Sequence, residues 1–151
     1  RHGSFIDFTS VAPLQNFFFG ITTPVSDLPV AGTASYSTGI NGSVTTSFSN
    51  HYGLLGSSSA DFTVDFADGS IDTTLNLVGV HRTTSVENNF GSHSGSGAIM
   101  NGGPGFQGTF DTVAGAFAGA FFGPQAVEMG YSFHMDAPDF DASGYVWGRK
   151  N

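Results

Sequence analysis

Two runs of alternating apolar and polar residues meet at an Asp-Gly pair in the stretch SADFTVDFADGSIDTTLNLVG, residues 59–79. Successive side chains of a strand point to opposite faces, so each run predicts a strand with one dry and one wet face. Asp68 and Gly69 both tolerate a positive φ, which suits a turn between antiparallel strands. The stretch therefore predicts a hairpin whose inward residues are Phe62, Val64, Phe66, Ile71, Thr73, Leu75 and Leu77.

The composition extends this prediction to the rest of the chain. Among 151 residues there are 22 Gly and 16 Phe, and only 11% are charged. Such a chain is short of the Lys, Glu and Leu that build amphipathic helices, whereas Phe and Thr suit strands. Its length is that of one domain, enough to bury roughly two-thirds of the unfolded surface around one core.

Further strands are predicted on either side of the central hairpin. Residues 32–39 and 43–50 form a second hairpin around the turn signal Ile40-Asn41-Gly42, and residues 96–101 and 105–112 form a third around Gly102-Gly103-Pro104. The polar stretch between them, residues 81–95, is expected to be an exposed loop.

The first 27 residues are predicted to be an extended, Pro-punctuated lead-in that packs on the domain formed by residues 28–151. Within it, Phe17, Phe18 and Phe19 are consecutive. We expect them to plug the open end of a barrel, and the alternative is an exposed docking patch.

The stretch GAFAGAFFGPQAVEMGYSFHM, residues 115–135, predicts a strand, a short helical turn and another strand. Small residues on both faces let the first strand coil tightly, as closure of a small barrel requires. Pro124 stops that strand and begins the helical turn. Afterwards Met129, Tyr131, Phe133 and Met135 face inward, and Ser132 and His134 face outward. On the last strand, Tyr145 and Trp147 are expected to be core or barrel-end packing.

Many short alternating strands without a helix-length pattern predict an antiparallel barrel or sandwich. A barrel also removes the exposed edges that Phe-rich strands would offer to neighbouring molecules. We therefore predict an eight-stranded up-and-down β-barrel with one short helical turn before the penultimate strand. The sequence shows about nine candidate strands, so one of them is misassigned or lies outside the sheet.

Charge and composition exclude several classes of protein. The chain has 4 Lys and Arg against 12 Asp and Glu, a formal net charge of -8, so it lacks the cationic stripe that binds nucleic acid or anionic lipid. The acidity favours a cationic partner. Without cysteine there are no disulfides or thiolate metal sites, and no apolar run reaches the roughly 20 residues of a membrane-spanning helix. Because the first residue is Arg1, we expect that an export signal has been removed or left out.

The end of the chain resembles a known family. GAFAGAFFGPQAVEMGYSF and the final GYVWGRKN are similar to the end of the C-terminal β-barrel of transferrin-binding protein B-like bacterial surface proteins. The motif residues are Gly115 to Pro124, Gln125 to Glu128, Gly130 to Phe133 and Gly144 to Lys150. LPVAGTASYSTG is similar to the family's opening barrel strand, and SADFTVDFADGSI to its Ala-Asp-Phe hairpin, so the resemblance covers residues 28–151.

This resemblance implies an eight-stranded barrel that lies on the outer surface of a Gram-negative bacterium or is released from it. Family members bind transferrin, haem-carrying proteins, free haem or complement regulators, through inter-strand loops or a neighbouring handle domain. Within these 151 residues we expect one barrel without a handle domain, and there is no cysteine that could serve as a lipid anchor. The chain is expected to be an exported binding protein that engages a protein partner or haem through its loops. The alternative is a structural or accessory subunit of a larger envelope or cell-surface assembly.

Haem is the more specific ligand hypothesis. His51 and Tyr52 follow a predicted strand, and His81, Arg82 and His93 flank the long polar stretch. An imidazole nitrogen or a phenolate from these positions has the chemistry to ligate iron. The alternative is that all five are solvated loop residues without a ligand.

Calcium is the second ligand hypothesis. Asp139, Asp141 and Ser143, followed by Gly144, place oxygen ligands at alternate positions as in the first half of a calcium loop. The bidentate acid expected at position twelve is replaced by Lys150. The alternative is an acidic turn between the last two strands.

Nothing in the sequence favours an enzyme. No G-x-S-x-G elbow, HExxH pair or phosphate loop is present. Ser and Asp occur throughout the chain, so their presence does not indicate a catalytic site. We predict a non-enzymatic protein.

Overall fold

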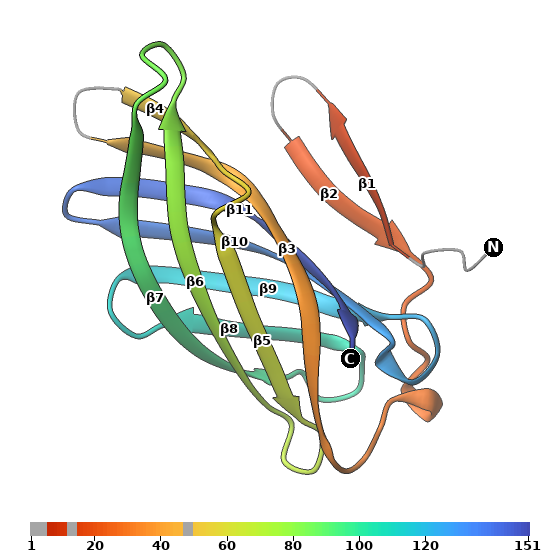
Figure 1. The fold of residues 1–151 in the computed structure, drawn as a ribbon. Helices are drawn as coiled ribbons and strands as arrows, with labels where there is room; N and C mark the ends of the chain where they lie inside the picture. The colour runs from red at the N-terminus through yellow and green to blue at the C-terminus, as the bar shows by residue number, and fades with distance from the viewer. Residues whose placement is uncertain (1–5, 12–14, 47–49) are drawn as a thin grey trace.

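The computed structural model describes residues 6–11, 15–46 and 50–151. They form an almost entirely β structure, with a small two-stranded sheet beside a large curved one (Figure 1). The elements in chain order are β1 Ile6–Val11, β2 Gln15–Gly20, a 3₁₀ turn η1 Val25–Asp27, β3 Thr33–Thr46, β4 Asn50–Leu54, β5 Ser59–Asp65, β6 Ser70–His81, β7 Glu87–Ile99, β8 Gly105–Phe110, β9 Ala114–Phe122, a second 3₁₀ turn η2 Pro124–Ala126, β10 Glu128–Ala137 and β11 Phe140–Lys150.

The large sheet closes into a ring of eight strand positions. Each of β6 to β10 pairs antiparallel with the next strand in the chain, and β11 pairs with β3 from Phe140↔Thr46 to Lys150↔Tyr36. Between β3 and β6, two short strands occupy a single position: β4 pairs with one half of β3 and β5 with the other, and both pair with β6. Of the nine candidate strands, those at residues 32–39 and 43–50 both fall mainly on the single strand β3, so eight remain, and the predicted eight-stranded architecture is confirmed.

The core is filled by the alternate side chains that the sequence pattern placed inside. Phe62, Leu75 and Phe106 are buried at the centre of the ring. Ring centroids of neighbouring aromatic residues in this core lie 5.0–6.3 Å apart, which is the range of favourable edge and tilted contacts. The predicted inward residues of the central hairpin and of β10 are all buried: Phe62, Val64, Phe66, Ile71, Thr73, Leu75, Leu77, Met129, Tyr131, Phe133 and Met135.

The hairpin predicted around Ile40-Asn41-Gly42 is wrong. These residues lie in the middle of β3, a continuous strand of 14 residues. Their register partners are Gly144 to Val146 on β11, the strand that closes the ring. A Cβ atom at Gly42 would overlap the backbone of Ser143 and come within 2.8 Å of the Gly144 Cα. The glycine thus permits a close approach between strands, and pairing with β11 overrides the turn propensity of Asn-Gly.

The long polar loop predicted for residues 81–95 is also wrong in extent. β6 continues to His81 and β7 begins at Glu87, so only residues 82–86 connect them. The pairing of β6 with β7 has one irregularity. Leu77 pairs with Gly91 and Val78 with Asn89, so Phe90 has no register partner on β6. The other two predicted turns are confirmed, and each contains a glycine with positive φ, +77° at Gly69 and +86° at Gly102.

The segment between β9 and β10 turns in a different way from a helical turn. Gln125 and Ala126 have φ of 53° and 54°, in the left-handed region, so η2 is not a right-handed helix. The Tyr36 hydroxyl donates a 2.6 Å hydrogen bond to the Ala126 carbonyl from inside the barrel. This bond fastens η2, through its one buried residue Ala126, to the core side of β3.

The lead-in is anchored where it joins the barrel. Thr22 forms a bridge with Phe122, which is buried although its side chain lies on the outer face by alternation. The Thr23 N–H donates to the Phe121 carbonyl at 3.0 Å, and the Thr23 hydroxyl donates to the Gly123 carbonyl at 2.7 Å. The division into a lead-in of residues 1–27 and a barrel of residues 28–151 stays a prediction.

Two expectations about aromatic residues are corrected. Phe19 is 45% exposed, so this side chain does not plug the barrel, and the side chains of Phe17 and Phe18 lie outside the described residues. Tyr145 and Trp147 lie on the outer face of β11, because the buried residue between them, Val146, takes the inward position. Within the described residues, no helix has the length and apolar character to cross a membrane.

Candidate functional site

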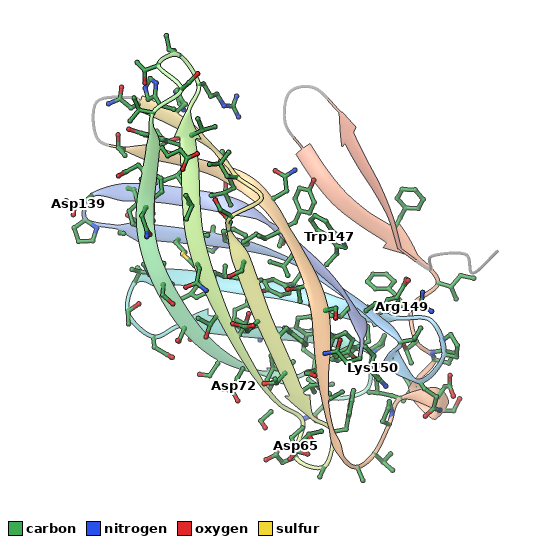
Figure 2. All side chains as sticks on the ribbon, in the orientation of Figure 1. Asp65, Asp72, Asp139, Trp147, Arg149 and Lys150 are labelled. Carbon is green, nitrogen blue, oxygen red and sulfur yellow. The ribbon has the colours of Figure 1, made fainter. Side chains whose placement is uncertain are left out.

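One end of the barrel gathers most of the sequence-predicted ligand residues. The strands β6 and β7 meet there through residues 82–86, β8 and β9 through residues 111–113, and β10 and β11 through residues 138–139. The start of β4 lies at the same end, because Tyr52 pairs with His81. We call these three connections and the first residues of β4 the loop rim. Figure 2 shows it at the end of the barrel away from Arg149 and Lys150.

A row of aromatic side chains underlies the loop rim. The Tyr52 ring contacts the His81 ring at 5.0 Å and the Phe90 ring at 5.1 Å, both edge to face. Phe140 continues the row, with centroids 5.4 Å from Phe90 and 5.7 Å from His93. Of the predicted residues, Tyr52, His81 and His93 are thus brought to one layer, which closes this end of the core.

The His81 imidazole is bound on both sides. Its Nδ1 accepts backbone N–H groups of Thr83 at 3.2 Å and Thr84 at 3.1 Å. A nitrogen that accepts carries no proton, so the neutral ring holds its hydrogen on Nε2. That nitrogen lies 3.4 Å from the Asn50 Oδ1 and donates to it. An iron ligand at His81 would therefore have to replace a bond that supports the turn.

His93 lies inside the barrel wall and not in an exposed loop. It belongs to β7 and is 8% exposed. Its Nε2 donates to the Phe90 carbonyl at 3.0 Å, and its Nδ1 lies 3.5 Å from the Thr112 hydroxyl. Both ring nitrogens thus have partners within the protein.

His51 and Arg82 are exposed, and their backbones are linked. The Arg82 N–H donates to the His51 carbonyl at 2.9 Å, and the His51 Nδ1 is hydrogen-bonded to the Thr45 hydroxyl at 3.1 Å. Arg82 directly follows β6, and Tyr52 lies on the neighbouring strand β4, so the structure groups all five predicted residues at one end. Haem ligation by them stays a prediction.

The predicted calcium ligands are spread along an extended strand. Asp139 lies in the connection between β10 and β11, while Asp141 and Ser143 lie on β11 and are exposed. Asp141 pairs with Asp136 on β10. Among the residues that the structure describes, no three His, Asp or Glu side chains gather closely enough to hold a metal ion. Calcium binding stays a prediction.

Sequence reasoning missed the residues that support the site. Phe90 stands alone in a polar stretch and Phe140 lies between two aspartates, so neither belongs to an alternating apolar run. Asn50, which receives the His81 bond, follows residues 47–49, which lie outside the described part of the chain. The one sequence signal for a buried role of Phe90 is that it is a single apolar residue in a polar stretch.

The loop rim is acidic. Arg82 is exposed there together with Asp111 and Asp139, and Glu87, the first residue of β7, is exposed beside the connection that it follows; we include it in the loop rim. The other cationic residues that the structure describes, Arg149 and Lys150, lie at the opposite end of β11. The connection between β6 and β7 also exposes Val86, at 62%, and holds Ser85 at a φ of 58°. The rim thus combines carboxylates, one guanidinium and an exposed apolar side chain.

A hollow of about 640 Å³ lies on the outer face of the barrel, over β8, β9 and β10. Ala116 and Ala118 on β9 form its floor, and Gln107 and Ser132 stand on the strands to either side. It contains no cluster of titratable groups, since His134 is its one ionisable residue.

Comparison with known proteins agrees with this architecture. Residues 28–150 match the model of a family described as the C-lobe and N-lobe beta barrels of Tf-binding protein B. The chain belongs to this family. A search among curated proteins finds no match.

Solved structures of the family show the same fold at low sequence identity. A variant of transferrin binding protein B from Haemophilus parasuis is 17% identical, with a TM-score of 0.70, over 99% of this chain and 34% of that one. The isotype 1 protein from serogroup B Neisseria meningitidis is 19% identical, with a TM-score of 0.65, over 100% of this chain and 32% of that one. The N-lobe domain of lactoferrin binding protein B of Moraxella bovis is 16% identical, with a TM-score of 0.53, over 97% of this chain and 70% of that one.

This barrel therefore spans about a third of the transferrin binding proteins that it resembles. The resemblance in sequence noted at residues 28–151 is confirmed by the family match and by these structures.

Proposed function

We propose that this barrel is a non-enzymatic binding domain of an exported bacterial protein, displayed on the outer surface of a Gram-negative cell, which captures a protein partner through its loop rim. The observation that carries the proposal is the exposed connection between β6 and β7, whose backbone N–H groups at Thr83 and Thr84 donate hydrogen bonds to the His81 imidazole. Family membership supports a binding role, because the similar proteins are named for binding transferrin or lactoferrin.

The charge of the rim favours a partner with a basic contact surface. Three carboxylates, on Glu87, Asp111 and Asp139, stand against the single guanidinium of Arg82. Opposite potentials on two surfaces speed their encounter, and the effect weakens as salt screens the charges. Binding at this rim is therefore expected to weaken as ionic strength rises.

A second function, as an accessory subunit of a larger envelope assembly, is favoured by apolar side chains near the other end. Ile21 is 70% exposed, Val25 58% and Val30 86%. All three belong to the short stretch in which the lead-in joins the barrel. Exposed apolar side chains that lie close together are typical of protein contact surfaces.

Charge reversal separates the two functions. The immobilised barrel is incubated with host serum and with purified transferrin, and the captured protein is identified and its Kd measured at low and high salt. Glu87→Lys with Asp139→Lys is expected to weaken capture at least about tenfold if the rim binds. Asp61→Lys with Asp72→Lys makes the same charge change on the outer face of β5 and β6 and serves as the matched control.

A different result would support the subunit instead. The barrel would capture nothing from serum but would co-purify with an envelope complex, and Ile21→Asp and Val30→Asp would abolish that co-purification.

A further inference from the structure

The connection between β6 and β7 is closed by His81 through three kinds of bond. Its Nδ1 accepts the N–H groups of Thr83 at 3.2 Å and Thr84 at 3.1 Å. Its backbone carbonyl accepts the Ser85 N–H at 3.0 Å, and its N–H donates to the Val86 carbonyl at 2.8 Å. Nδ1 therefore acts as the side-chain oxygen of Asn or Asp does in an Asx turn, holding successive backbone N–H groups.

The same imidazole also reaches the neighbouring strand. Nε2 donates to Asn50 Oδ1 at 3.4 Å, and beside it the Arg82 N–H donates to the His51 carbonyl at 2.9 Å. One ring thus joins the connection between β6 and β7 to the start of β4. Ser85, held at a φ of 58°, adopts a conformation that costs free energy in a residue other than glycine and persists only where the surroundings impose it.

We propose that His81 is a positioning residue that fixes the connection of residues 82–86 against the start of β4, so that this part of the loop rim is preformed for a folded protein whose basic contact surface faces the carboxylates of Glu87, Asp111 and Asp139. The proposal rests on the proposed function for the identity of the partner. The physical gain is preorganisation: a loop that is ordered before binding loses less conformational entropy in the complex. Without the imidazole, the N–H groups of Thr83 and Thr84 would turn to water and the connection would sample several conformations.

Replacement of His81 by amides separates the roles of its two ring nitrogens. His81→Asn keeps an acceptor near the position of Nδ1, so it preserves the bonds to Thr83 and Thr84. His81→Gln keeps a polar group near Nε2, toward Asn50, but loses the acceptor near Nδ1. His81→Ala removes both, and His134→Ala removes an exposed histidine of β10 as the matched control for stability.

Amide hydrogen exchange of Thr83 and Thr84, read by NMR on the folded barrel, tests the positioning role without any partner. In the wild type and in His81→Asn we expect equal protection, and in His81→Gln and His81→Ala an increase of at least about tenfold in exchange rate, with core amides unchanged. Unchanged exchange in His81→Ala, or equally fast exchange in His81→Asn and His81→Ala, would overturn the proposal.

Association kinetics with a captured serum partner test the docking role. His81→Ala is expected to lower the association rate about tenfold and His81→Asn to restore it, while His134→Ala has no effect. If the exchange results hold and the partner binds all variants equally, the surface is preformed but does not dock the partner, and the proposal fails. If the wild type captures no partner, the proposed function fails, and the exchange data still decide whether His81 positions the connection.

Discussion

The Trp147 indole on β11 lies over the Cα of Gly39 on β3, at the seam where the ring closes. The two residues are direct register partners. A Cβ atom built on Gly39 would overlap the Cζ2 and Cε2 atoms of the indole. The tryptophan therefore covers the space that a side chain at residue 39 would otherwise fill, on the outer face of the barrel, and Tyr145 packs beside it with a centroid distance of 5.6 Å.

A side chain at Gly39 is expected to weaken this seam. Gly39→Val forces the indole away from β3 and should lower the free energy of unfolding by about 1–3 kcal/mol, as measured in urea. Gly53→Ala is the control, because nothing lies within 4 Å of its Cβ position. Combining Gly39→Val with Trp147→Ala should recover part of the loss. Equal stability of Gly39→Val and Gly53→Ala would show that the indole moves without cost.

The buried hydroxyl pair of Tyr131 and Thr73 predicts an asymmetry between two deletions. The Tyr131 hydroxyl and Thr73 Oγ1 are 2.7 Å apart, and Oγ1 also donates to the Asp61 carbonyl at 2.8 Å. Tyr131→Phe leaves Thr73 with its second partner and should cost about 1 kcal/mol, whereas Thr73→Val strands a buried phenol and should cost about 2–3 kcal/mol. Urea unfolding at pH 7 measures both free energies.

The double variant of these residues supplies the control. Removing both hydroxyls leaves no polar group stranded, so the double variant should be no less stable than Thr73→Val alone. If Tyr131→Phe proves the more costly single change, the phenol contributes through a contact other than the one to Thr73.

Local sequence patterns predict the individual strands better than the pairing of β3 with β11 that closes the barrel. The hairpin of β5 and β6 follows from alternation around Asp68-Gly69, because one face of each strand is buried all along its length. Asn41-Gly42 carries an equally good turn signal but lies within β3. Asn41 pairs with Tyr145 and Gly42 with Gly144 on the last strand, β11, and a single-sequence pattern contains no information on a pairing of that separation.

For the candidate site too, the sequence predicts local structure but not which segments are neighbours. The sequence brings His51 and Tyr52 to a strand end, and His81 with Arg82 to another, but it does not show that these ends are neighbours. The Gly, Ser and Asn residues around His93 predict a loop, yet His93 lies in β7, where glycines at 95 and 97 allow close strand packing. Polar composition predicts exposure only on average, and an imidazole with two partners can be buried at little cost.

Acid is expected to release the lead-in from η2. The Asp27 carboxylate accepts the Gln125 backbone N–H at 2.9 Å and its Nε2 at 2.5 Å, and these bonds lower the pKa of Asp27. A carboxyl group with a lowered pKa stabilises the folded contact above its unfolded pKa of about 3.9, and this contribution is lost as the pH falls through the lower folded value.

The Gln125 amide proton reports this release. Its chemical shift in NMR spectra should move with a midpoint below pH 3.8, the ordinary value for Asp27, and the shift should not titrate in Asp27→Asn. Asp27→Ala should show the released shift at neutral pH. A midpoint at or above the ordinary value would mean that the hydrogen bonds to Gln125 do not persist in solution.

Alkali is expected to unfold the barrel through its buried phenols. Burial raises the pKa of both Tyr36 and Tyr131 well above the usual value of 10.0, because a phenolate would lose its hydration. Each phenol then contributes stability that is fully present below about pH 10 and is lost as the pH rises, since the unfolded chain releases the proton first.

Absorbance at 295 nm and far-ultraviolet dichroism, followed together from pH 8 to 13, should show ionisation of these two residues in the same step as loss of the β signal. The variant with both Tyr36→Phe and Tyr131→Phe should lose that coincident step. When urea is used to give this variant and the wild type the same free energy of unfolding at pH 7, the variant should unfold at the higher pH. Ionisation of Tyr36 or Tyr131 while the dichroism stays native would mean that water reaches their hydroxyls in the folded barrel.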